Sequence, residues 1–151
     1  MAKLLIIGAS RGIGLETVKA ALRGGHRVRA LARSAASIPI ENGDLEKLSG
    51  NALDSETIGN ALEVVEVVIQ TLGVDISLRA IVEPTTLFSR STRILVDAMK
   101  AAGVNRLVAV TGLGAGDSRG HGGILYDGVV FPLLLKRVYG DKDVQEWIIK
   151  S

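Results

Sequence analysis

The stretch that decides the fold is Lys3–Gly14, KLLIIGASRGIG, close to the start of the chain. Its four consecutive large apolar residues, Leu4–Ile7, are typical of a short strand that is buried on both faces. After this stretch the apolar residues recur near helical spacing, so Gly8, Gly12 and Gly14 fall in a turn between a strand and a helix. The pattern therefore predicts a strand, a glycine-rich turn and a helix in direct succession.

Such a turn suits a phosphate group for physical reasons. Gly8 permits a tight turn, Gly12 lets backbone N–H groups approach a pyrophosphate, and Gly14 lets the helix pack close to the strand. The first N–H groups of the helix have no acceptor within the helix, and the helix dipole favours an anion there. The turn predicts a dinucleotide site, to which we assign Gly8, Ser10, Arg11, Gly12, Ile13 and Gly14.

The composition of the 151 residues excludes several classes of function. Hydrophobic residues make up 47% of the chain and aromatic residues only 3%, so the core must consist of aliphatic side chains, and stacking on nucleic-acid bases is disfavoured. The absence of cysteine excludes disulfides and thiolate chemistry, and the two histidines do not stand at metal-ligand spacing. We therefore expect no metal site and a small-molecule substrate as the partner.

Net charge and hydropathy bear on the partners and the location that we expect for the protein. The net charge is +2 and the sequence pI is about 9.1, but the basic residues are spread along most of the chain, so we expect no nucleic-acid partner. No apolar run approaches the ~18 residues of a membrane span, and Met1 leads directly into the first strand. We expect a cytoplasmic protein that does not bind membranes. The oligomeric state stays open, with a homodimer as one option.

The rest of the chain alternates predicted helices and strands. We expect helices at 12–22, ending at Gly24-Gly25, at 54–62 and at 87–102, and strands at 26–33, 45–48, 64–71 and 107–110. Two further helical segments, 124–135 and 139–149, should be interrupted near Pro132 and Gly140. This alternation predicts one α/β domain over residues 1–151, a Rossmann-type doubly wound parallel sheet of order 3-2-1-4-5 with helices on both faces.

The end of the second strand indicates which dinucleotide fits. NAD-selective domains carry an acidic residue about twenty residues after the glycine turn, where it binds the ribose hydroxyls. Here Arg33 stands at that place, and no acidic residue occurs between Glu16 and Glu41. Arg33 can bind the 2'-phosphate of NADP in bidentate fashion, with Arg11 beside it. We expect NADP(H) to be preferred over NAD(H); two solvated surface arginines are the alternative interpretation.

The spacing Gly8-x-x-x-Gly12-x-Gly14 resembles the glycine motif of the short-chain dehydrogenase/reductase superfamily. Residues 142–146 resemble the lysine segment of its atypical branch of NmrA-like, biliverdin-reductase-like and epimerase-dehydratase-like NAD(P)H-binding proteins. The resemblance implies hydride transfer to or from a small carbonyl, quinone or flavin-like substrate. It also implies cofactor contacts from Asn51, Ala52, Thr71, Leu72 and Gly73; for Asn51 a simple turn residue is an equal alternative.

The same resemblance supplies candidates for catalysis. The superfamily generally uses a hydroxyl after strand five and a Tyr-x-x-x-Lys pair, and these roles fall on Thr111, Tyr139 and Lys142, with Thr111 and Lys142 also at the cofactor. Tyr139, however, precedes Lys142 by three residues instead of four. This register favours a second hypothesis, an NADP(H)-sensing module that regulates a partner without turnover. Related proteins continue with a sixth strand and a substrate-binding part, which we expect this chain to lack.

Overall fold

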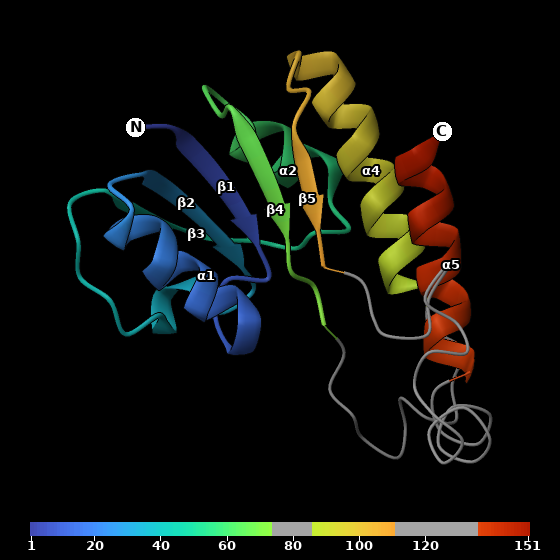
Figure 1. Cartoon of the computed structure of the whole chain (residues 1–151), viewed down its shortest axis with the longest axis horizontal. Helices are drawn as coiled ribbons and strands as arrows, with labels where there is room; N and C mark the ends of the chain where they lie inside the picture. Colours follow the sequence, from blue (N-terminus) through green and yellow to red (C-terminus); the bar gives the residue numbers. More distant parts are fainter. Residues whose placement is uncertain (74–85, 111–135) are drawn as a thin grey trace. The chain divides into compact units, whose positions relative to one another are not determined.

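The computed structural model describes residues 1–73, 86–110 and 136–151 (Figure 1). The chain divides into two compact units, one comprising Met1–Gly73 with Ile94–Val110 and the other Val74–Arg93 with Thr111–Ser151. The helix expected at 124–135 and its interruption at Pro132 lie outside the described residues.

A parallel sheet of five strands forms the centre of the first unit. The strands are β1 (Lys3–Ile7), β2 (Arg27–Ala32), β3 (Leu45–Ser49), β4 (Val67–Gln70) and β5 (Leu107–Ala109). Their order is β3-β2-β1-β4-β5, and every neighbouring pair is parallel, which confirms the predicted fold class and strand order. Because all carboxyl ends of parallel strands point the same way, the residues after β1, β2, β3 and β4 share one edge of the sheet.

The helices end where the sequence signals predicted. Helix α1 (Gly12–Arg23) is followed by Gly24 and by Gly25 with a φ of +73°, and α4 (Leu87–Ala102) is followed by Gly103 with a φ of +70°. Helix α2 (Ser55–Ala61) begins after Asp54, whose carboxylate accepts a hydrogen bond from the Thr57 backbone N–H. A 3-10 turn, η1 (Ala35–Ser37), lies between β2 and β3.

Helix α5 (Lys136–Lys150) corrects one expectation. It runs through Gly140 without a break, so the predicted interruption there is wrong. A glycine inside a helix costs about 1 kcal/mol relative to alanine, which burial elsewhere along the helix can offset. In α5 the side chains of Asp141, Lys142, Gln145 and Ile148 are all buried.

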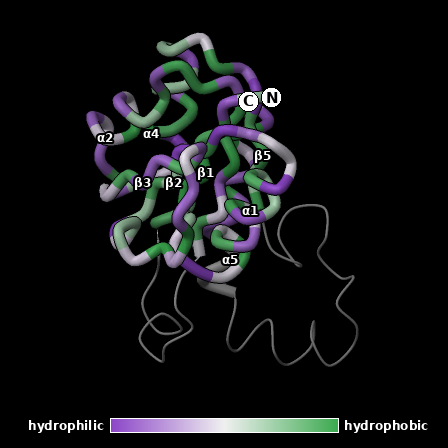
Figure 2. Tube along the Cα trace, turned by 90° about the vertical axis from the view of Figure 1, so that its left-hand side faces the viewer, coloured by the Kyte–Doolittle hydropathy of each residue, from purple (hydrophilic) through white to green (hydrophobic). Residues whose placement is uncertain are grey.

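Strand β1 is buried on both faces because its side chains alternate between two cores. Leu4 and Ile6 belong to the core that contains Val18 of α1, whereas Leu5 and Ile7 belong to the core beneath α2 and α4. The apolar residues of these segments can be followed in Figure 2. Helix α1 thus covers one face of the sheet, and α2 with the later turns of α4 covers the other (Figure 1).

Strand β4 starts later than predicted for a local reason. Val64, the expected first residue, has a φ of +54° and is 77% exposed. A left-handed backbone is uncommon for any residue with a side chain and is an outlier for a β-branched one. The chain therefore turns at Val64 after α2 and enters the sheet only at Val67.

Candidate cofactor site

The glycine turn follows β1 at the carboxyl edge of the sheet. The backbone N–H groups of Gly8 and Ala9 both donate to the carbonyl of Leu31 on β2, over 2.9 and 3.3 Å. Gly8 has a φ of +87°, and a Cβ there would lie only 2.8 Å from the carbonyl oxygen of Thr71. A Cβ at Gly14 would overlap the carbonyl oxygen of Gly8. The left-handed backbone and the nearby Thr71 carbonyl therefore require glycine at position 8, and the close approach of α1 to the turn requires glycine at position 14.

Gly12 differs from these two glycines because the space beside it is open. It has a φ of +55°, and no atom lies within 4 Å of the position that its Cβ would occupy. Arg11 is the N-cap residue of α1, and its side chain makes no capping hydrogen bond. Arg11 and Gly12 are exposed, as is Ile13 at 63%. An uncapped helix start beside open space fits the pyrophosphate of a dinucleotide.

Thr71 supports the glycine turn from the next strand. Its backbone N–H and its hydroxyl both donate to the carbonyl of Ile7, each over 2.8 Å, and the residue is buried. Its hydroxyl would lie 2.7 Å from a Cβ at Gly14, so Thr71 occupies the space that this glycine leaves. Leu72 is half-buried and Gly73 is exposed at the same edge.

Asn51 follows β3 and forms a turn. Its side-chain oxygen accepts a hydrogen bond of 3.0 Å from the Leu53 N–H, and its backbone carbonyl accepts one from the Asp54 N–H. Asn51 is exposed and Ala52 is half-buried. The hydrogen bonds from Thr57 lower the pKa of the Asp54 carboxyl, which acts as a helix cap. The turn interpretation of Asn51 thus has a structural basis, and its contact with adenine stays a prediction.

Between Glu16 and Glu41 the chain has no acidic residue. Most basic residues of this interval are paired with Glu16 or with acids that lie beyond Glu41. Lys19 pairs with Glu16 at 2.7 Å, and Arg27 pairs with Asp44 at 3.6 Å. Arg33 is exposed directly after β2, and within the described residues no carboxylate lies in ion-pairing range of its guanidinium. Less positive charge is therefore available to a phosphate than the number of basic residues in this interval suggests. The position of Arg33 favours it as the residue that binds the phosphate.

Arg29 has a structural role that the sequence did not reveal. It is 9% exposed in β2 and binds Glu46 of β3 in bidentate fashion, with N···O distances of 2.7 and 3.0 Å. Its Nη1 also donates to the carbonyls of Asn60, Ala61 and Glu63 at the end of α2. The hydrogen bonds from Arg29 hold the pKa of the Glu46 carboxyl below its ordinary value. Arg29 thus joins two strands to a helix C-terminus.

The catalytic candidates belong to the second unit. Lys142 is 9% exposed, and its Nζ lies 4.1 Å from the centre of the Phe88 ring. Burial lowers the pKa of the Lys142 ammonium group, and the charges of Glu146 and Asp141 oppose this shift. Lys142 is therefore not a solvated surface residue. Thr111 and the side chain of Tyr139 lie outside the described residues.

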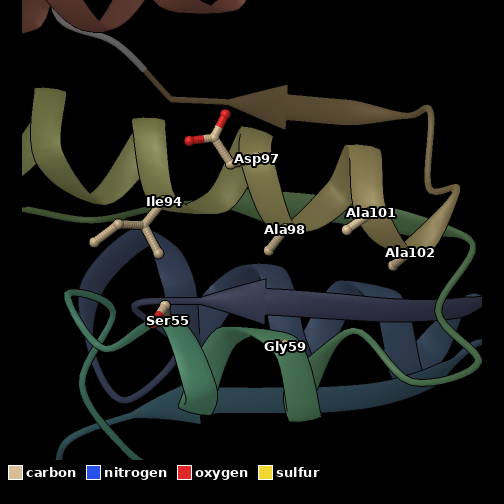
Figure 3. Close-up of a pocket in the computed structure, with 7 residues that line it drawn as sticks. All are labelled: Ser55, Gly59, Ile94, Asp97, Ala98, Ala101 and Ala102. Atoms are coloured by element: carbon tan, nitrogen blue, oxygen red, sulfur yellow. The ribbon is translucent and has the colours of Figure 1, made fainter.

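A hollow of about 530 Å³ lies away from the glycine turn, between α2 and α4 (Figure 3). Ser55 and Gly59 of α2 face α4 across it, and the residues from α4 are Ile94, Asp97, Ala98, Ala101 and Ala102. Asp97 is the one charged side chain among these lining residues, and its sign is unfavourable for a pyrophosphate. We therefore assign the cofactor to the glycine edge and not to this hollow.

Comparison with solved structures shows the same fold in other proteins, one of which is in complex with NADP. ChuY from Escherichia coli CFT073 is 22% identical, with a TM-score of 0.71. The match covers 100% of this chain and 66% of the ChuY chain. ChuY from E. coli O157:H7, described as an anaerobillin reductase, is 22% identical with a TM-score of 0.72 over 99% of this chain and 67% of its own. A short-chain dehydrogenase/reductase from Veillonella parvula in complex with NADP is 16% identical, with a TM-score of 0.77 over 99% of this chain and 64% of its own.

The chain thus spans about two thirds of the length of these structures. In residues 1–73, 86–110 and 136–151 no helix has the length and apolar character needed to cross a bilayer. Over the same ranges, no cluster of histidine and acidic side chains could hold a metal ion. Residues 8–151 match the NAD(P)H-binding domain family. This match covers nearly the whole chain and confirms the NAD(P)H-binding family predicted from the glycine motif, so the chain belongs to the NAD(P)H-binding domain family.

Proposed function

We propose that the chain binds NADP(H) in preference to NAD(H) and that it forms the cofactor domain of an oxidoreductase. The observation that carries the NADP(H) preference is the exposed Arg33 after β2, at the position where NAD-selective domains need an acid. An arginine there can pair with the 2'-phosphate, whereas a carboxylate would repel it. The exposed Arg11 at the start of α1 supports the same choice.

The proposed placement of the cofactor follows the carboxyl edge of the sheet. Backbone N–H groups are donated to the pyrophosphate by Ser10, which precedes α1, and by Gly12 and Ile13 in the first turn of α1. Asn51 and Ala52 lie beside the adenine. Because the Asn51 side-chain oxygen already accepts a hydrogen bond from Leu53, its amide N–H groups are the natural donors to a ring nitrogen of the base.

The reaction that we propose is hydride transfer between NADP(H) and a small carbonyl, quinone or flavin-like compound. The bound nicotinamide supplies the hydride. Thr71, Leu72 and Gly73 border its ribose, Lys142 donates a hydrogen bond to the ribose hydroxyls, and the Thr111 hydroxyl polarises the substrate oxygen. Tyr139 is the candidate proton donor. The ChuY protein described as an anaerobillin reductase and the NADP complex from Veillonella support this class of reaction.

A second function, an NADP(H) sensor without turnover, is favoured by one observation. Helix α5 is continuous, so Tyr139 and Lys142 stand three residues apart on one helix. Moving the tyrosine by one position rotates it about 100° around the helix axis relative to a Tyr-x-x-x-Lys pair. NADPH oxidation measured with quinone, flavin and carbonyl acceptors separates the two functions, since a sensor binds the cofactor but does not oxidise it.

Calorimetric titration with NADPH and NADH tests the proposed specificity. The unchanged protein should bind NADPH more tightly, and Arg33→Ala should weaken NADPH binding about ten- to hundredfold, the equivalent of one charge-assisted hydrogen bond of roughly 1.5–3 kcal/mol. NADH binding should change little. Arg27→Ala is the matched control, because Arg27 lies on the same strand at its opposite end and pairs with Asp44. Equal affinities for the two cofactors, or an Arg33→Ala variant that keeps its preference, would contradict the assignment.

A further inference from the structure

The contact between the first turns of α4 and the middle of α5 includes several buried polar side chains. Within the second unit, Asp141 is 8% exposed, Lys142 9% and Gln145 1%, and Ser91 and Thr92 on α4 are fully covered. Buried charges are costly unless other groups compensate them. The roles of Asp141 and Lys142 can be read from their contacts with Phe88.

Asp141 caps α4 from a distant point in the sequence. Its carboxylate accepts a hydrogen bond of 2.7 Å from the Phe88 N–H and longer ones of 3.3 Å from the Ser89 N–H. These N–H groups belong to the first turn of α4, where a side chain from the residue before the helix usually provides the acceptor. Here the acceptor comes from α5, 53 residues further along the chain.

The neighbouring Lys142 rests on the same residue. Asp141 holds the backbone of Phe88, and the ammonium group of Lys142 lies over the ring of Phe88 at 4.1 Å from its centre. Two consecutive residues of α5 thus contact one residue of α4. A shift of α5 along α4 would break both contacts together, so the Asp141 cap fixes where the Lys142 ammonium group stands.

We propose that Asp141 is a positioning residue for Lys142, which it seats against Phe88 so that the ammonium group can meet the cofactor ribose. This inference rests on the proposed function for the role of Lys142. The seat itself is a property of the protein without cofactor, so it can be tested separately.

Two effects of Asp141 on Lys142 have opposite signs and can be distinguished. The negative charge of Asp141, like that of Glu146, raises the pKa of Lys142, whereas burial in the seat lowers it and is the larger effect. If Asp141 acts only as a nearby charge, its removal should lower the Lys142 pKa further. If it holds the seat, Asp141→Ala should release Lys142 to water and raise the pKa toward the ordinary value of lysine.

The first experiment titrates Lys142 without cofactor. The lysines are 13C-methylated, the Lys142 signal is identified by its loss in Lys142→Arg, and its pKa is followed by NMR. We expect Asp141→Ala to raise the pKa and Asp141→Asn to lower it, because the amide oxygen can still cap α4 while the charge is gone. Asp143→Asn, which removes the next carboxylate in the helix, should not raise it. A lower pKa in Asp141→Ala would overturn the inference whether or not NADPH binds.

The second experiment is a double-mutant cycle on NADPH affinity. As a single substitution, Asp141→Ala should weaken NADPH binding about three- to tenfold. In a protein that already carries Lys142→Ala, the same substitution should weaken it less than twofold. Asp141→Asn should retain most of the affinity. Equal effects in both backgrounds would show that Asp141 does not act through Lys142, although NADPH binding itself would stand. Absence of binding in the unchanged protein would remove the proposed function, and the seat would then be decided by the titration alone.

Discussion

The glycine turn offers a perturbation in which cofactor binding and folding can be separated. Gly12 is the first residue of α1 and Gly25 lies two residues after its last, and both have left-handed backbones, with φ values of +55° and +73°. At both positions no atom lies within 4 Å of the place where a Cβ would stand. The same substitution, glycine to alanine, therefore imposes the same kind of backbone strain and no steric clash at either site.

The strain of a left-handed alanine is about 1–2 kcal/mol. For a chain of this size a loss of about 1 kcal/mol lowers Tm by roughly 2–4 °C, so both variants should remain folded and should differ little in Tm. Only Gly12→Ala places a methyl group where the pyrophosphate should lie. Losing one charge-assisted hydrogen bond from the helix start, roughly 1.5–3 kcal/mol, would weaken NADPH binding about ten- to hundredfold.

Thermal unfolding followed by circular dichroism measures the strain, and calorimetric titration measures the affinity. We expect similar Tm values for Gly12→Ala and Gly25→Ala, with NADPH affinity lost only in Gly12→Ala. Undiminished affinity in a folded Gly12→Ala would show that the pyrophosphate does not lie at the start of α1. A parallel loss of affinity in Gly25→Ala would show that strain, and not occupation of the site, is the cause.

Three further predictions concern stability. Arg29→Ala should lower the free energy of unfolding by about 3–5 kcal/mol, because it leaves buried helix carbonyls without a hydrogen-bond donor. The exposed Arg27→Ala should lower it by about 0–1 kcal/mol, and urea unfolding measures both values. Val64→Gly should raise it by about 0.5–1 kcal/mol in the same assay, because glycine accepts the left-handed backbone and little buried surface is lost. Glu46 has a lowered pKa in the folded state. Its contribution to the free energy of unfolding is therefore complete above the pKa of an unfolded glutamate, about 4.3, and is lost as pH falls through the pKa of Glu46 in the folded protein. Acid titration of Glu46→Gln should lack this component.

Local signals predicted most of the described fold. The strand order follows from an alternation of buried strands and helices with right-handed crossovers, and the glycines after α1 and α4 and the Asp54 cap of α2 are signals within a few residues of the helix ends. The sequence also predicted Gly8 as a tight-turn residue, which has a φ of +87°, and Gly14 as a close-approach position, which leaves no room for a side chain.

Contacts between distant segments could not be predicted in this way. The structural role of Arg29 could not be predicted, because nothing near it in the sequence shows that Glu46 and the end of α2 would surround it. The Asp141 cap joins residues 53 positions apart, and the helix around Gly140 is kept by such contacts. In the candidate site, the residues contributed by local turns were predictable, whereas the packing that holds Lys142 was not.

The charges on β3 also bear on aggregation. Strand β3 has a single neighbour in the described sheet, so one row of its backbone groups faces outward. Glu46 on β3 is tied to Arg29, and Lys47 pairs with Glu41 at 2.7 Å. Charged side chains on an edge strand discourage another extended chain from adding to it, since the newcomer would have to strip water from those charges. The ion pairs of β3 therefore protect this edge against intermolecular strand pairing.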